Sequence, residues 1–220
     1  MTTRKLYSKE MEELTGSLEE MSNLVEASLE NLFFSIEKKD KELASRIIRD
    51  DHNVNSLERS IESQCLLLIT TQQPIAGDLR LVSSVLKVVT DVERIGDHAS
   101  DIAELILQMD HTQLDAYSSH LKPMITAARE MVHEAVSAFI DRDEVKAGEV
   151  IKSDDIVDSL FDKVKHDIAE TLKAQHSDAF ECIDALMIAK YLERIGDHAV
   201  NICEWEIFRE TGTIQDTQIF

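Results

Sequence analysis

The chain has few of the residues that interrupt helices or build tight turns. Of its 220 residues only 6 are glycine and 2 are proline, and aromatic residues make up 5%. A β-sheet protein with many turns needs more of these residues, whereas long helices rich in Leu, Glu, Lys, Ala and Met do not. The composition therefore favours an all-α fold.

Long apolar runs and cysteine pairs are also missing. An apolar run such as Cys65–Ile69 is far shorter than the roughly 20 residues of a membrane-spanning helix. The first residues, MTTRKLYSKEMEEL, lack the apolar segment of a secretory signal. The three cysteines, Cys65, Cys182 and Cys203, contain no CxxC pair, which predicts reduced thiols in the core. We expect a soluble, cytoplasmic protein.

Basic residues are in the minority. The chain has 23 Lys and Arg against 43 Asp and Glu, a formal net charge of −20. A surface with this charge repels the phosphates of nucleic acids and of anionic lipids, so we expect neither as a partner. Cations and basic protein surfaces are the expected partners.

Six long segments carry apolar residues at the spacing of an α-helix. They cover about residues 6–39, 41–72, 74–109, 121–140, 144–175 and 179–209. Asp40 suits the N-cap of the second helix, and Pro74 suits the first turn of the third. The fourth can begin before Pro123, because a first turn tolerates proline. The polar stretch 110–120 is predicted to be the only long linker.

The heptapeptide ERIGDHA occurs twice, at Glu93–Ala99 and at Glu193–Ala199. An identical recurrence of this length indicates the duplication of a larger unit. Aligning the second and fifth helices supports this, because Asp51 then matches Asp154 with a shift close to that of the heptapeptides. The sequence predicts two tandem, pseudo-symmetric three-helix bundles, residues 1–112 and 113–220.

Each heptapeptide places a Glu and an Asp one helical turn apart. At about 100° per residue, Glu93 and Asp97 lie within about 40° of each other and roughly 150° from the centre of the apolar stripe. No lysine follows either pair at i+4 to neutralise it. Further carboxylates lie on the second and fifth helices near their apolar rims. The candidate metal ligands are Glu93, Asp97, Glu193, Asp197, Asp51, Asp154 and Asp158.

Carboxylate clusters of this kind suit hard or borderline cations, namely magnesium, manganese, iron or zinc. His98 and His198 follow the Asp by one residue, so they are expected to flank the ion rather than to bind it with the pair. Gly96 and Gly196 each cost a helix about 1 kcal/mol relative to Ala, which calls for a reason such as close approach of backbone or ligand. An ordinary solvated acidic face is the alternative interpretation.

Four segments together resemble the PhoU family of phosphate-transport accessory and regulatory proteins. They are LERIGDHAVNICEWEIF, VERIGDHASDIAELI, QQPIAGDLRLV and DDHNVN, and the resemblance covers nearly the whole chain. It implies two three-helix bundles with multinuclear metal sites on their outer face, built from the duplicated carboxylate pairs. Asn55 stands opposite Asp158, and Asn201 stands opposite Asp101, so we expect the two sites to differ.

The resemblance also implies a function. Members of the family are negative regulators of the phosphate-starvation response, bridging the ATPase of the phosphate ABC transporter and a sensor histidine kinase, and the family is not known as an enzyme. We accordingly predict a homodimer that protein contacts hold at the cytoplasmic face of the membrane. Residues 72–80 are either a simple helix-start turn or a recognition loop.

Two other functions stay open. One is a purely structural helical adaptor, whose acidic faces only keep it soluble. The other is a ferritin-like di-iron carboxylate enzyme, which needs Glu and Glu-x-x-His residues that project into a four-helix core. Only Glu130 with His133 matches that motif, and it has no second copy.

Overall fold

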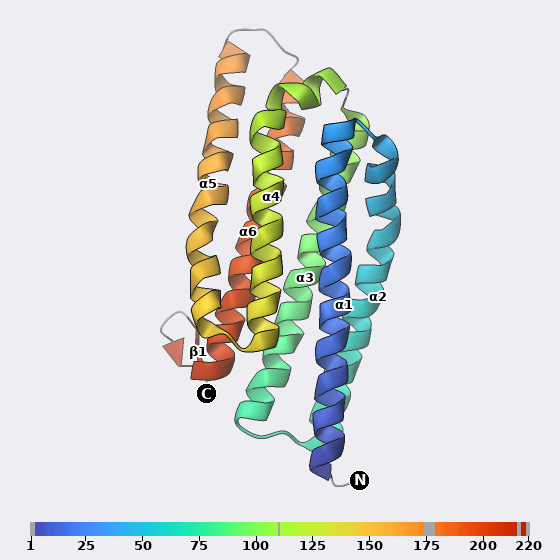
Figure 1. The fold of residues 1–220 in the computed structure, drawn as a ribbon, viewed down its shortest axis with the longest axis vertical. Coiled ribbons are helices and arrows are strands. Elements are labelled where there is room, and N and C mark those ends of the chain that lie inside the picture. Colours follow the sequence, from blue (N-terminus) through green and yellow to red (C-terminus); the bar gives the residue numbers. More distant parts are fainter. Residues whose placement is uncertain (1–2, 110, 174–178, 215–216, 219–220) are drawn as a thin grey trace.

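Six long helices make up almost all of the described chain (Figure 1). The computed structural model describes residues 3–109, 111–173, 179–214 and 217–218. The helices are α1 (Thr3–Lys38), α2 (Lys41–Gln72), α3 (Gly77–Gln108), α4 (His111–Asp141), α5 (Glu144–Lys173) and α6 (Ala179–Thr211). A short antiparallel pair, β1 (Thr213–Ile214) and β2 (Thr217–Gln218), follows α6. The prediction of an all-α fold with six helices is confirmed.

The start of α2 is as expected and the start of α3 is not. A carboxylate oxygen of Asp40 accepts a hydrogen bond from the backbone N–H of Glu42 at 3.0 Å, so Asp40 is the N-cap. Pro74, by contrast, precedes α3, which begins at Gly77. Gln73 and Ala76 have φ values of 48° and 47°. Gln73 is in the left-handed helical region and Ala76 lies outside every helical region, so no helix can continue through either residue.

The predicted linker 110–120 is wrong, because α4 begins at His111 and Pro123 lies inside it. A proline within a helix removes one backbone hydrogen bond and costs about 3 kcal/mol. Tyr117 and Leu121 are buried before it, and this burial favours the longer helix. The predicted end of the fifth helix at Gln175 lies outside the described residues, since α5 is described up to Lys173.

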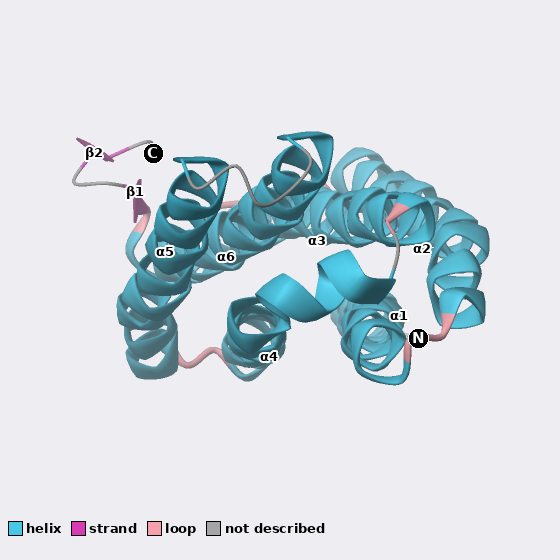
Figure 2. Cartoon of the chain, turned by 90° about the horizontal axis from the view of Figure 1, so that it is seen from above, coloured by secondary structure: helices cyan, strands magenta, loops and turns pink. Residues whose placement is uncertain are grey.

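The helices form one layer of four with two helices on one side. Seen from above, α5, α6, α3 and α2 lie in a row, and α4 and α1 pack along the same side of it (Figure 2). Contacts between α3 and α6 and between α1 and α4 join the two repeats. No helix of the described chain covers the other side of the row, which we call the open face.

The core lies between the layer and the helix pair α1 and α4. The central helices α3 and α6 run in opposite directions, since Arg80 Nε donates to the carbonyl of Arg209 at 3.2 Å and His98 stacks on Tyr191. Val92, Ile95 and Ala99 of α3 are fully buried, as are their equivalents in α6. The three cysteines are free and buried, as predicted. Across the described residues, no helix is apolar over a length that would cross a bilayer.

Candidate metal centre

The first carboxylate site lies between α2 and α3 on the open face. We define it by Asp51 and Glu58 of α2 and by Glu93 and Asp97 of α3. The helix turns its apolar side to the core, so Arg94, Asp97 and Asp101 point to the open side and are partly or fully exposed. The Glu93 side chain is only 15% exposed. The predicted outward position is therefore correct for Asp97, whereas Glu93 is half-hidden against α2.

The second carboxylate site is the equivalent one between α5 and α6. It consists of Asp154 and Asp158 of α5 and of Glu193 and Asp197 of α6. Glu193 is again 15% exposed, while Asp158 and Asp197 are exposed. The structure thus brings all seven predicted ligands into two groups, one in each repeat.

The two glycines of the heptapeptides make room for the aspartates of the neighbouring helix. A Cβ atom on Gly196 would lie 2.8 Å from Oδ1 of Asp154. A Cβ atom on Gly96 would lie 3.6 Å from Oδ1 of Asp51 and 3.2 Å from Cγ1 of Val54. The close approach inferred from the sequence is therefore real, and it is made by Asp154 in the second repeat and by Val54 in the first, where Asp51 is in ordinary contact.

The same two oxygen atoms have no partner of their own. Oδ1 of Asp51 and Oδ1 of Asp154 are buried and accept no hydrogen bond. An unsatisfied buried carboxylate oxygen is costly, and it occurs at equivalent positions of both repeats. A bound cation would satisfy it, so the donor set fits a metal ion such as magnesium, manganese, iron or zinc.

Burial and the charge of neighbouring carboxylates raise the pKa of Asp51 and Glu93 in the first site and of Asp154 in the second. Burial, followed by the charge of Asp97, raises the pKa of Glu93 to about 6. Burial, followed by the charge of Asp158, raises the pKa of Asp154 to about 6. The pKa of Asp51 is also raised, mainly by burial, although Asn55 donates to its Oδ2 at 2.9 Å. Both sites therefore concentrate negative charge that a cation would relieve.

Basic side chains on the same helices offset part of this charge. Arg94 lies 3.1 Å from Asp97 and 3.6 Å from Glu93, and Lys190 pairs with Glu193. The absence of a lysine at i+4 therefore did not mean that the pairs lack counter-charges, because these come from other positions. Among the described residues, no three His, Cys, Asp or Glu side chains already stand in an arrangement that could hold an ion. The carboxylates are close but would have to turn toward a metal.

The two histidines lie between the sites rather than in them. The rings of His98 and His198 are 5.6 Å apart between α3 and α6. Nδ1 of His198 is 2.8 Å from Oδ1 of Asp91, and His98 stacks on Tyr191 at 5.3 Å. Each histidine is adjacent in sequence to an aspartate of its own repeat, and the two rings meet at the boundary between α3 and α6.

Sequence reasoning missed Glu58, Asp91 and Lys190. Glu58 is two turns after Asp51, on the same side of α2, and this spacing was a usable signal. These three residues are not shared between the repeats, since their equivalents are Phe161, Tyr191 and Thr90. The duplication in the sequence indicates only those residues that both repeats share.

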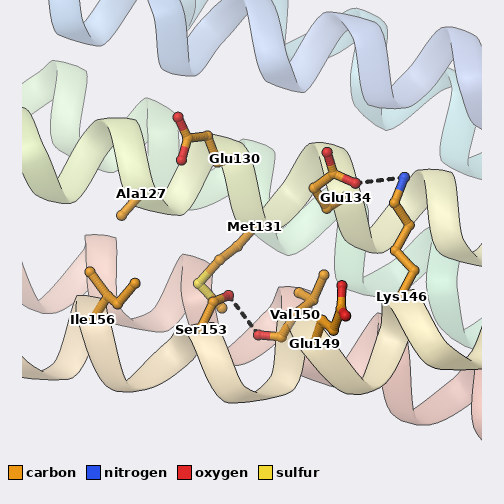
Figure 3. A pocket seen from close by; sticks show the side chains of 9 residues that line it. All are labelled: Ala127, Glu130, Met131, Glu134, Lys146, Glu149, Val150, Ser153 and Ile156. Carbon is orange, nitrogen blue, oxygen red and sulfur yellow. Dashed lines mark hydrogen bonds and ion pairs between the residues drawn. The ribbon is translucent and has the colours of Figure 1, made fainter.

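A separate pocket of about 260 Å³ lies between α4 and α5 (Figure 3). Glu130 lines it together with Glu134, which pairs with Lys146 at 2.6 Å. His133 points elsewhere and pairs with Glu26 at 3.1 Å, with 60% of its side chain exposed. The only Glu-x-x-His motif therefore does not point into a helical core, as a di-iron centre requires.

Comparison with known proteins agrees with this architecture. A family model described as the PhoU domain matches residues 18–106 and 121–205, once in each repeat. A phosphate-specific transport system accessory protein PhoU homolog of Clostridium acetobutylicum is 35% identical over 211 residues, 96% of either chain. A homolog with the same description in Borreliella burgdorferi is 31% identical and covers 96% of this chain and 97% of its own.

Two crystal structures are similar over nearly the whole chain. PhoU, the phosphate transport system regulatory protein of Streptococcus pneumoniae, has a TM-score of 0.88 and 30% identity, covering 96% of this chain and 100% of its own. PhoU from Pseudomonas aeruginosa has a TM-score of 0.84 and 29% identity, covering 94% and 100%. Fold and sites define an all-α protein of two repeats with one carboxylate site in each. The chain belongs to the PhoU family.

Acidification should have opposite effects on metal binding and on the stability of the metal-free chain. A folded-state pKa of about 6 for Glu93 and Asp154 lies above their ordinary values of 4.5 and 3.8. The stability that these groups contribute is thus fully present below the ordinary pKa values and is lost as the pH rises through 6. Metal requires the deprotonated carboxylates, so its affinity should rise over the same range.

Thermal unfolding between pH 4 and pH 7, with and without Mn²⁺, checks this. The double variant E93Q/D154N should show a flatter pH dependence and no added stabilisation by Mn²⁺ at pH 7. Glu206, whose pKa burial raises to about 7, titrates in both proteins and cancels in the comparison. Identical pH profiles for the two proteins would contradict the prediction.

Proposed function

We propose that this chain is an accessory protein of phosphate uptake and a negative regulator of the phosphate-starvation response. It bridges the ATPase of a phosphate ABC transporter and a sensor histidine kinase, and its two carboxylate sites bind divalent metal. Relatives that match 96% of the chain are phosphate-specific transport system accessory proteins, and this supports the transport role. The unpartnered carboxylate oxygens at equivalent positions support the metal sites.

Protein contacts are the proposed means of recruitment. With a net charge of −20, the chain is repelled by anionic lipid, whereas basic surfaces of partner proteins attract it. Phe180, Ile183 and Met187 follow the i, i+3, i+7 pattern on α6 and are 77%, 51% and 37% exposed. An apolar stripe of this kind suits a protein partner. The proposal places the chain at the cytoplasmic side of the membrane and includes a homodimer as the active form.

Deleting the gene should leave phosphate-starvation genes expressed in phosphate-rich medium, because the kinase loses the partner that keeps it inactive. The measurement is a starvation-promoter reporter together with phosphate uptake. Re-expression of the wild-type chain should restore repression, and this controls for secondary effects of the deletion. Normal repression and normal uptake in the deletion strain would reject the regulatory role and favour the structural-adaptor function.

Binding of the purified chain to the cytoplasmic parts of its partners should weaken as salt rises, since charge complementarity drives the encounter. A pull-down from a phosphate-replete lysate at low and high salt measures this.

A further inference from the structure

The two carboxylate sites hold the same number of carboxylates but differ in the basic side chain that pairs with them, which is Arg94 in the first site and Lys190 in the second. The second site contains Asp154, Asp158, Glu193 and Asp197, and the first contains an equal number of acidic groups. One helical turn before the half-buried glutamate of each site, which is Glu93 or Glu193, the first repeat has Thr90 and the second has Lys190. A lysine therefore stands beside the second site at a position where the first repeat has an uncharged residue.

Lys190 places its ammonium group directly on the inner carboxylate of the second site. Its Nζ pairs with Oε2 of Glu193 and lies 5.5 Å from the ring centroid of Phe161. Burial and the charge of Glu193 raise the pKa of Asp197, and the charge of Lys190 opposes that rise. The ammonium therefore acts on two of the four carboxylates that a metal ion would use.

The first repeat has no such group at this place. The hydroxyl of Thr90 donates to the carbonyl of Leu86 at 3.2 Å and brings no charge. In the second repeat the ring of Phe161 lies beneath Lys190, and the equivalent residue in the first repeat is Glu58, which carries a carboxylate instead. Arg94 pairs with Asp97 and Glu93 of the first site at 3.1 and 3.6 Å, with 55% of its side chain exposed, and the second repeat has Arg194 at the same position.

Resting on the proposal that both sites bind divalent metal, we propose that Lys190 is a built-in cation of the second site that a metal ion must displace from Glu193. Two positive charges at one carboxylate repel each other strongly in a partly buried place. The ammonium group of Lys190 can move away from Glu193, because its side chain is 38% exposed and its long aliphatic chain allows the charged end to reach water. Removing the charge of Lys190 should therefore raise the affinity of the second site for metal.

Mn²⁺ titration in two single-site backgrounds tests this. E93Q/D97N retains the second site, and E193Q/D197N retains the first, with affinity measured by calorimetry or by the electron paramagnetic resonance of free Mn²⁺. K190M should raise the affinity of the second site about tenfold. T90K, the reciprocal change, should lower that of the first site by a similar factor. K87M is the matched control, because Lys87 is exposed on α3 one turn before Thr90, and it should change neither.

The amine reactivity of Lys190 provides a second measurement. Reductive methylation followed by mass spectrometry should show greater modification of Lys190 once the second site is saturated with Mn²⁺, because the ammonium has been released from Glu193. Unchanged affinity in K190M, with Mn²⁺ still bound, would overturn the role of Lys190 and leave the metal sites intact. Absence of Mn²⁺ binding in both backgrounds and in the unsubstituted chain would overturn the metal sites themselves.

Discussion

Replacing Glu93, Asp97, Glu193 and Asp197 by the corresponding amides should abolish metal binding by the chain. Residues that only hydrogen-bond to metal ligands typically contribute 10- to 100-fold to metal affinity. Loss of the four proposed ligands themselves should therefore weaken metal binding by more than about 100-fold. Helicity should be retained, because these side chains lie outside the buried stripe of α3 and α6. Metal analysis of the purified protein, with circular dichroism for the fold, is the measurement.

A control with the same change in net charge separates specific binding from general attraction of cations. Amides at four exposed acidic positions away from the open face serve this purpose: Glu13, Glu30, Glu130 and Asp141. This control should bind as much metal as the unsubstituted chain. Equal metal content in the site variant and the control variant would show that the duplicated pairs are not ligands, and only a solvated acidic face would remain.

The second large effect is on stability. Ile95 and Ile195 are fully buried at equivalent positions of the central helices. Ile95→Ala or Ile195→Ala should lower the free energy of unfolding by about 2 to 5 kcal/mol, because each change removes buried apolar atoms and leaves a cavity. Chemical denaturation followed by circular dichroism measures the loss.

Ile183→Ala is the matched control, since Ile183 lies on α6 with 51% of its surface exposed. That substitution should change the free energy of unfolding by less than about 1 kcal/mol. Midpoints unaffected by the two buried changes would mean that the faces of α3 and α6 are assigned in reverse, with the carboxylates directed inward.

The histidines of the two repeats meet at the boundary between α3 and α6. Asp97 and Asp197 belong to different sites, and each is followed by a histidine whose ring lies 5.6 Å from the other.

The starts of α3 and α4 could not be predicted from the local sequence. Residues 110–120 are polar, with Pro123 close behind, and each feature alone argues for a loop. The helix extends through them because Tyr117 and Leu121 are buried by other helices, a gain that no local pattern contains. The predicted start of α3 at Pro74 was wrong because Gln73 and Ala76 have positive φ values. Neither residue is a glycine, so the sequence does not mark this turn.

By itself the sequence determined the six helices, the duplication and the seven carboxylates, because helical periodicity and an identical heptapeptide are properties of residue order alone. Only the tertiary structure decided that Asp51 and Asp154 lie against the glycines of the neighbouring helices and that their buried Oδ1 atoms lack hydrogen-bond partners. It also decided that Lys190 pairs with Glu193 in the second site. Which side chains of α2 meet α3 depends on how the helices pack, and packing is set by the whole core rather than by any one segment.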